Sequence, residues 1–308
     1  MDGYPTTMLE FEEWFSSEAD CRAYLYEIRW PDGFVCPQCS HGKGWESNRE
    51  LYVCASCGHQ VSLTSGTVFH RTRKPLMLWF RAMWHVTNQK HGVSALGLQR
   101  ALGLGSYRTA WTWLHKLRHA MVRPGRDRLH GVVEVDETYI GGARSGKRGR
   151  GAEGKTLVMI AVEDKGTGIG RIRLQQIEDA SGQSLTDAIK ATIEPGSNIR
   201  TDGWRGYNSL KQHGYSHEIA GRGDCIVGEN LLPLAHRIAS LLKRWLTGTH
   251  QGAVQPSHLD YYLDEYTFRF NRRTSRSRGK LFYRLVQQAL MVDPVEGKEI
   301  RGGKKSMT

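Results

Sequence analysis

The chain has 308 residues, 39% of them hydrophobic, and a formal net charge of +12 at pH 7. This length suits two or three domains of about 100–200 residues each, and the apolar content excludes wholesale disorder. The excess of Lys and Arg favours a polyanionic partner, because these side chains displace counterions from phosphates. No apolar run approaches the roughly 20 residues of a membrane span, and the acidic, amphipathic start does not fit a secretory signal. We therefore expect a cytoplasmic protein without a membrane partner.

The N-terminal segment, residues 1–30, contains apolar side chains at helical spacing from residue 9 onward. This pattern predicts an amphipathic helix over 9–30. We expect it to pack against the region that follows.

Two CxxC pairs separated by fourteen residues come next, formed by Cys36, Cys39, Cys54 and Cys57. This spacing is typical of a zinc ribbon, predicted here over 31–66, in which four thiolates close a tetrahedral site around a structural Zn²⁺. Disulfides or a redox CxxC are the alternative, and the missing secretory signal disfavours them. Cys21 and Cys225 stand alone and are expected to be buried small residues.

A predicted DNA-binding region covers 70–125 and begins with a strong helical pattern over 74–89. Two short helices, 93–102 and 107–121, are joined by a glycine turn, which is typical of a helix-turn-helix. The second helix carries side chains that suit phosphates or base edges: Arg108, Trp111, Trp113, His115, Lys116, Arg118 and His119. A plain three-helix bundle with solvated basic residues remains the alternative.

From residue 130 the pattern becomes mixed, and we expect an α/β domain over 130–295 with a basic tail over 296–308. The predicted strands are 131–140, 156–164, 169–178 and 198–202, and the predicted helical segments are 182–193, 204–212, 232–246, 257–270 and 280–292. Three antiparallel strands followed by helix, strand and helices is the order of a ribonuclease-H-like domain. In that fold the first and fourth strands are neighbours, which would bring Asp136 and Asp202 together.

Asp136 and Asp202 each close a short run of alternating apolar residues, 132–136 and 199–202, and His236 and Lys243 lie seven residues apart on one face of a predicted helix. Carboxylates from separate strands are how proteins hold Mg²⁺ beside a phosphate, and two ions suit in-line displacement at phosphorus. Asp136 would bridge the ions, with Asp202 and His236 as further ligands and Lys243 as a phosphate contact. An imidazole ligand tilts the preference from Mg²⁺ toward Mn²⁺.

Ordinary explanations exist for each of these residues, since a lone Asp at a strand end is often a turn residue. Rivals for the third ligand are Glu229, although Pro233 suggests a helix start after it, and Glu134, which shares a strand face with Asp136. Glu137 should point away from that face.

Two basic segments fit DNA as substrate: the glycine-rich 141–151 beside Asp136, and the arginine-rich 269–280. A disordered loop and a solvated tail are the corresponding alternatives.

Four stretches together resemble one family: CPQC…CASC, VEVDETYIGG, RTDGWRGYNSL and HRIASLLKRWLTGTHQGAV. The chain resembles bacterial insertion-sequence transposases that combine an N-terminal zinc ribbon with an Asp-Asp-Glu/Asn type, ISXO2-like catalytic domain. The resemblance implies that Asp136 and Asp202 are acidic metal ligands and that Lys243 follows the third ligand by two helical turns. His236 stands where Glu or Asn is usual.

The resemblance implies a DNA transposase that binds element ends and catalyses metal-dependent strand cleavage and strand transfer. Its partners would be double-stranded DNA, as terminal repeats and as target, and a second copy, because two ends must be held together in a homodimer or larger assembly. A non-catalytic DNA-binding regulator derived from a transposase is one alternative, with His236 as its best support. A metal-dependent DNA nuclease is the other.

Overall fold

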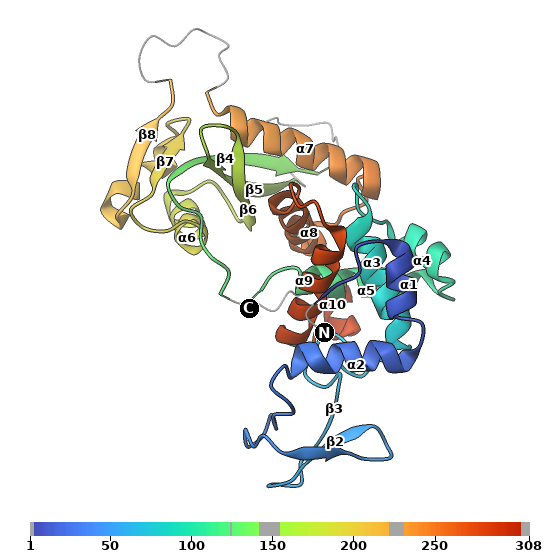
Figure 1. Ribbon diagram of the computed structural model, residues 1–308. Helices are drawn as coiled ribbons and strands as arrows, with labels where there is room; N and C mark the ends of the chain where they lie inside the picture. The colour runs from blue at the N-terminus through green and yellow to red at the C-terminus, as the bar shows by residue number, and fades with distance from the viewer. Residues whose placement is uncertain (1–2, 124, 142–154, 222–230, 303–308) are drawn as a thin grey trace. The chain divides into compact units, whose positions relative to one another are not determined.

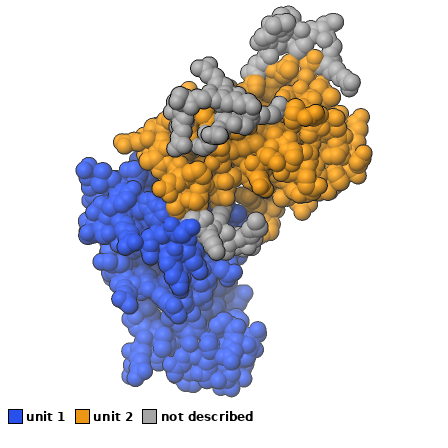
Figure 2. Space-filling view, turned by 180° about the vertical axis from the view of Figure 1, so that it is seen from behind, with its two compact units in different colours: residues 1–124, 275–308 blue, residues 125–274 orange. Residues whose placement is uncertain are grey.

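The computed structural model describes residues 3–123, 125–141, 155–221 and 231–302 (Figure 1). Most of the predicted glycine-rich segment, Cys225, Glu229 and the end of the basic tail lie outside these residues. The chain divides into two compact units (Figure 2): residues 1–124 with 275–308, and residues 125–274.

The first unit contains a small sheet and seven helices within its described residues. Its elements are α1 (Met8–Trp14), α2 (Glu18–Arg29), β1 (Gly44–Glu46), β2 (Leu51–Cys54), β3 (Gln60–Ser62), α3 (Leu76–Asn88), α4 (Ala95–Leu102), α5 (Tyr107–Ala120), α9 (Arg278–Met291) and α10 (Gly297–Arg301). The three strands form an antiparallel sheet in the order β1-β2-β3.

The N-terminal segment forms two helices where the sequence predicts one. Ser17 interrupts it with a capping box: its hydroxyl accepts a hydrogen bond from the Asp20 backbone N–H at 3.2 Å, and the Asp20 carboxylate accepts one from the Ser17 backbone N–H at 2.8 Å. Such reciprocal bonds begin a new helix. The expected packing on the ribbon is confirmed for α2, where Arg22 pairs with Glu46 at 2.8 Å.

Helix α9 belongs to the first unit, although the sequence places it in the domain predicted over 130–295. Phe282 on α9 is fully buried, and its ring lies 5.5–5.7 Å from the rings of Phe11, Phe15, Phe80 and Trp84. This aromatic cluster ties α9 to α1 and α3. The segment predicted as a basic tail likewise begins with a helix, α10, which contacts α5 and buries Ile300.

The second unit is a five-stranded mixed sheet with helices on both faces (Figure 1). Its elements are β4 (Val132–Ile140), β5 (Thr156–Asp164), β6 (Ile169–Ile177), α6 (Gly182–Thr192), β7 (Asn198–Thr201), the 3₁₀ turns η1 (Arg205–Tyr207), η2 (Leu210–His213) and η3 (Pro256–His258), β8 (Ser216–Ile219), α7 (Pro233–His250) and α8 (Leu259–Asn271). The strand order is β6-β5-β4-β7-β8. Strand β8 at the edge is absent from the sequence-based prediction.

Strand β4 lies at the centre of this sheet, antiparallel to β5 and parallel to β7. The adjacency of the first and fourth strands is therefore confirmed. Apolar side chains of β5 and β6, such as Ile160, pack against Ile238 of α7 and Leu263 of α8. On the other face, Val135 of β4 packs with Ile189 of α6. Among the described helices, none combines the length and apolarity needed to cross a membrane.

Candidate functional site

The four cysteines of the two CxxC pairs converge, with sulfur atoms all within 4.8 Å of one another. The Cys36 and Cys57 sulfurs are 3.7 Å apart, and those of Cys39 and Cys54 are 3.6 Å apart. A tetrahedral zinc site with Zn–S bonds of about 2.3 Å has sulfur–sulfur edges of about 3.8 Å. These residues therefore fit a closed Zn²⁺ site, as predicted.

Local backbone donors favour the thiolate at one position of this cluster, Cys54. The N–H groups of Cys57 and Ser56 lower the pKa of the Cys54 thiol to about 6. Because zinc binds the thiolate, a thiol that deprotonates easily is the form that the site requires.

The candidate acidic site is built on the register of two parallel strands. Glu134 of β4 pairs with Arg200 of β7. Asp136 and Asp202 each lie two residues beyond this pair, in the same direction because the strands are parallel. The sheet thus places Asp136 and Asp202 at equivalent positions on two neighbouring strands.

Asp136 contacts helix α7 directly. Its Oδ2 lies 3.3 Å from Nε2 of His236, and the two side chains are 15% and 52% exposed. Lys243, two turns further along α7, is exposed and close enough for the Asp136 carboxylate to raise its pKa. Partial desolvation and Lys155 outweigh this effect and lower the pKa of Lys243 overall. Asp136 and His236 are therefore in contact, and Lys243 of the same helix lies within electrostatic range of Asp136.

Glu134 shares the strand face of Asp136, as expected, but it serves a different purpose. Its buried Oε2 accepts hydrogen bonds from the backbone N–H groups of Leu234 and Ala235, at 2.9 and 3.0 Å. These donors lie in the first turn of α7, which starts at Pro233 and has unsatisfied N–H groups there. Burial raises the pKa of Glu134, and the two backbone bonds partly offset that effect. Glu134 thus holds the start of α7.

Asp202 lies in a tight turn after β7 and is exposed. Its Oδ1 accepts a hydrogen bond from the Trp204 backbone N–H at 2.9 Å, which is the local turn pattern of an Asx residue. Gly203 between them has a φ of 82°, and the Trp204 indole N–H donates to the Ala180 carbonyl at 2.9 Å. The TDGW motif therefore fixes the direction in which Asp202 leaves the strand.

Tyr207 interacts with carboxylates of both acidic motifs. Its hydroxyl donates to Oε1 of Glu137 at 2.6 Å, so Glu137 points to the face opposite Asp136, as predicted. Burial raises the pKa of Tyr207 well above its usual value, and the charges of Glu137, Asp136 and Asp202 raise it further. One buried hydroxyl thus experiences all three carboxylates. Sequence reasoning missed this link, although Tyr207 stands in the quoted GWRGY motif.

The spacing of the acidic set restricts how metal ions fit it. Among the described residues, the four cysteines are the one group of three or more His, Cys, Asp or Glu whose ligand atoms all lie within 4.8 Å. Asp136, Asp202 and His236 therefore do not surround one ion in this structure. Asp136 and Asp202 carry oxygen donors of the kind that Mg²⁺ and Mn²⁺ prefer, and His236 adds a nitrogen donor.

The predicted DNA-contacting face of α5 is largely inside the protein. His115, Arg118 and His119 are at most 3% exposed, and Trp113 is buried as well. The expectation that these side chains reach DNA is wrong in this structure, because they pack into the core of the first unit. Arg108 is exposed and Lys116 is partly exposed, and both lie on the remaining face.

Arginine side chains at the start of the basic segment 269–280 make contacts within the protein, unlike those of a solvated tail. Arg269 pairs with the buried Glu265 at 2.8 Å. The guanidinium groups of Arg272 and Arg273 stack over the rings of Phe268 and Phe270, at 4.1 and 4.0 Å. These contacts give the end of α8 a structural role.

Comparison with known proteins relates both the cysteine cluster and the acidic site to transposase domains. Residues 128–271 match the model described as the ISXO2-like transposase domain, and residues 16–60 match the transposase zinc-ribbon domain. The chain carries an ISXO2-like transposase domain behind a transposase zinc ribbon. The match to the ISXO2-like domain ends at residue 271, close to residue 274, where the second compact unit ends.

One relative is a Halobacterium salinarum protein described as an uncharacterized protein in transposable element ISH50. It is 29% identical over 299 residues, covering 86% of this chain and 94% of the relative. The similarity therefore includes both compact units.

Proposed function

We propose that this protein is the DNA transposase of an insertion sequence, which binds the element ends and catalyses metal-dependent strand cleavage and strand transfer. The observation that carries the proposal is the position of Asp136 at the sheet centre, 3.3 Å from His236 and beside Lys243, within a transposase domain. Composition supports it too, because a charge of +12 suits a polyanionic substrate.

The fold of the catalytic unit would be ribonuclease-H-like. Three consecutive antiparallel strands, followed by a fourth strand parallel to the first, support this assignment. Helix α6 on one face and α7 with α8 on the other agree with it.

Each residue of the site has a proposed role in phosphoryl transfer. Bound Mg²⁺ or Mn²⁺ supplies activation of the attacking oxygen and stabilisation of the leaving one. Asp136 and Asp202 would hold the ions with His236 as the third ligand, and Lys243 would contact a phosphate oxygen as a point charge. Glu134 positions His236 by fixing the start of α7 on β4.

The first unit would recognise the element ends. The zinc ribbon and the pair α4–α5, proposed as a helix-turn-helix, are the modules for terminal repeats. We propose a homodimer or larger assembly on DNA, because strand transfer requires two ends in one complex.

The test is a nicking assay on labelled duplex made from the DNA that flanks the gene, with Mg²⁺ or Mn²⁺. Wild-type protein should nick one fixed end position, and Asp136→Asn should abolish nicking. Asp187→Asn is the matched control, because Asp187 is an exposed carboxylate on α6, at the opposite face of the sheet from α7. This control should cleave like the wild type.

The same assay separates the alternatives. Specific binding of the end duplex without nicking in either metal would favour a non-catalytic regulator and would contradict the proposal. Nicking that never yields joined products with a target duplex would favour a nuclease.

A further inference from the structure

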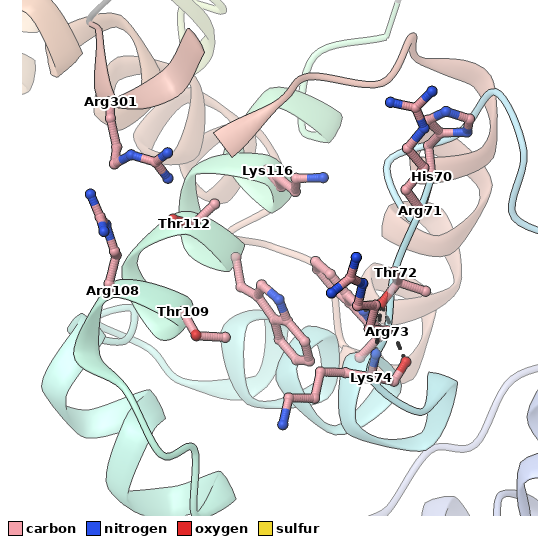
Figure 3. A pocket seen from close by; sticks show the side chains of 12 residues that line it. His70, Arg71, Thr72, Arg73, Lys74, Arg108, Thr109, Thr112, Lys116 and Arg301 are labelled. Carbon is pink, nitrogen blue, oxygen red and sulfur yellow. Dashed lines mark hydrogen bonds between the residues drawn. The ribbon is translucent and has the colours of Figure 1, made fainter. Parts of the chain in front are cut away.

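A basic pocket opens in the first unit (Figure 3). Its volume is about 280 Å³, and its walls come from residues 70–74, one face of α5 and the end of α10. None of its twelve lining residues is acidic, whereas six are Arg or Lys: Arg71, Arg73, Lys74, Arg108, Lys116 and Arg301. We name this cavity the 70–74/α5 pocket.

The pocket is held in shape by interactions beneath it. The rings of Trp79 and Trp113 stack with centroids 3.8 Å apart. The Trp79 indole N–H donates to the Thr72 hydroxyl at 2.9 Å, and that hydroxyl accepts a further bond from the Lys74 backbone N–H at 3.2 Å. Arg71 adopts a φ of 55°, in the left-handed region that costs a side-chain-bearing residue about 1 kcal/mol. These interactions hold the backbone of residues 70–74, which carries Arg71, Arg73 and Lys74, in one conformation.

One carboxylate beside the pocket, Glu296, partly offsets this concentration of cations. Glu296 lies 3.6 Å from Arg71, and its charge raises the pKa of Lys116. Desolvation outweighs that effect and lowers the pKa of Lys116 overall. Arg108 and Arg301 lie on one side of the pocket, His70 and Arg71 on the other, with Lys116 between them (Figure 3). Like charges gathered around an open cavity are stabilised when an anion enters it.

We infer that the 70–74/α5 pocket binds backbone phosphates of duplex DNA, an inference that rests on the proposed transposase function. Arginine and lysine match phosphate oxygens, and the hydroxyls of Thr109 and Thr112 on the same face add neutral donors. Helix α5 therefore meets DNA through the face of Arg108, Thr112 and Lys116. These interactions set the position of the duplex and carry no base sequence.

The first test measures duplex affinity of the full-length protein by fluorescence anisotropy over a salt series, without added Mg²⁺ or Mn²⁺. The variant combines Arg73→Ala and Arg108→Ala, two exposed residues from separate walls of the pocket. Arg284→Ala is the control, because Arg284 is an exposed arginine on α9 of the same unit and lies outside the pocket. Zinc content and far-ultraviolet circular dichroism confirm that each protein is folded.

The expected result is about 10-fold weaker binding by the double variant at low salt, equally for end DNA and unrelated DNA. The slope of log affinity against log salt should decrease by about 1 for each phosphate that the variant no longer neutralises. The control should retain both the affinity and the slope. A double variant that binds like the control overturns the inference, and so does a weakening confined to the end sequence.

A second arm distinguishes DNA from a free anion, using inorganic pyrophosphate and the unfolding temperature. One outcome is that pyrophosphate raises the unfolding temperature of the wild type and not of the double variant, while both proteins bind duplex equally well. That result identifies a small-anion site and overturns the DNA assignment. The proposed function fails separately: wild-type protein would then nick no end duplex, whatever the pocket variants do. If the wild-type protein nicks the end duplex and the double variant binds duplex as tightly as the wild type, only the pocket proposal is overturned.

Discussion

The cysteine cluster and the acidic cluster are both predicted metal sites, but they are assembled in different ways. The four cysteines lie within 22 residues of one another, with Cys54 at the end of β2 and the other three in loops beside the small sheet, and their sulfurs already have the spacing of a tetrahedron. Asp136, Asp202 and His236 come from a strand, the turn after another strand and a helix, spread over a hundred residues. Their arrangement depends on the sheet, on the Glu134 bond to α7 and on the turn at Gly203. A local site is fixed by its own spacing, whereas a distributed one depends on its supports.

The largest effect is expected from Cys54→Ser. Losing one thiolate should abolish zinc binding and unfold the ribbon, because structural zinc contributes on the order of 10 kcal/mol. Zinc content and protease resistance of residues 31–66 would measure this. Cys21→Ala is the control, because burial raises the pKa of the Cys21 thiol to about 12 and the residue lies outside the cluster. Equal zinc loss in both variants would contradict the local character of the site.

Glu163→Gln should remove an acid-sensitive support of the second unit. Burial alone would raise the pKa of Glu163, but the Arg171 guanidinium at 2.6 Å outweighs it and lowers the pKa to about 2. A lowered folded-state pKa stabilises the fold above the unfolded value of about 4.5 and loses that contribution as pH falls toward 2. The contribution is about 3 kcal/mol at neutral pH.

Urea unfolding of wild type and Glu163→Gln between pH 7 and pH 2 checks this prediction. The difference in unfolding free energy should shrink below pH 4.5. A difference that stays constant down to pH 2 would exclude Glu163 as its source.

Glu134→Leu should slow strand cleavage by about 100-fold while the protein stays folded. The variant removes the acceptor that fixes Leu234 and Ala235, so α7 no longer holds His236 accurately beside Asp136. Glu134→Gln keeps an acceptor oxygen and should recover most of the rate. The rate constant of nicking in single-turnover conditions is the readout, and duplex affinity should not change. Equal rates for Leu and Gln variants would show that Glu134 does not position α7.

The smallest effect is expected from Gly203→Ala, which strains the turn that carries Asp202. Its φ of 82° and a new Cβ at 2.6 Å from Ile219 Cγ2 should cost about 1–2 kcal/mol and reduce nicking severalfold. Gly166→Ala is matched in conformation, with a φ of 70° and no atom within 4 Å of the added Cβ. This control should lose similar backbone stability and keep its nicking rate. If both variants nicked equally fast, the turn would not matter for Asp202.

Sequence patterns predicted the strands of the second unit well because each has a strong local signal. Strand β5 contains a continuous apolar run over 157–162 and is almost entirely buried, so its predicted bounds of 156–164 match the observed ones. Strand β8 was missed because Ser216–Ile219 is a short, polar edge strand without that pattern. The capping box at Ser17 was readable in the sequence and still escaped the single-helix prediction.

The parts of the molecule that depend on tertiary packing could not be predicted. An apolar face on α9 does not reveal its partner, and Phe282 proved to pack with α1 and α3 of the first unit. Likewise, His115 has no sequence signature that distinguishes a buried histidine from a DNA-contacting one. The role of Glu134 depends on amides one hundred residues away, which only the folded sheet brings close.

The most direct measurement of the central claim is a titration of the full-length protein on duplex DNA with Mn²⁺, following free ion by electron paramagnetic resonance. Wild-type protein should bind up to two Mn²⁺ per chain. Asp136→Asn should lose this binding while retaining its zinc, because the two sites are built independently. Unchanged Mn²⁺ binding in Asp136→Asn would contradict the account and place the ions elsewhere on the chain.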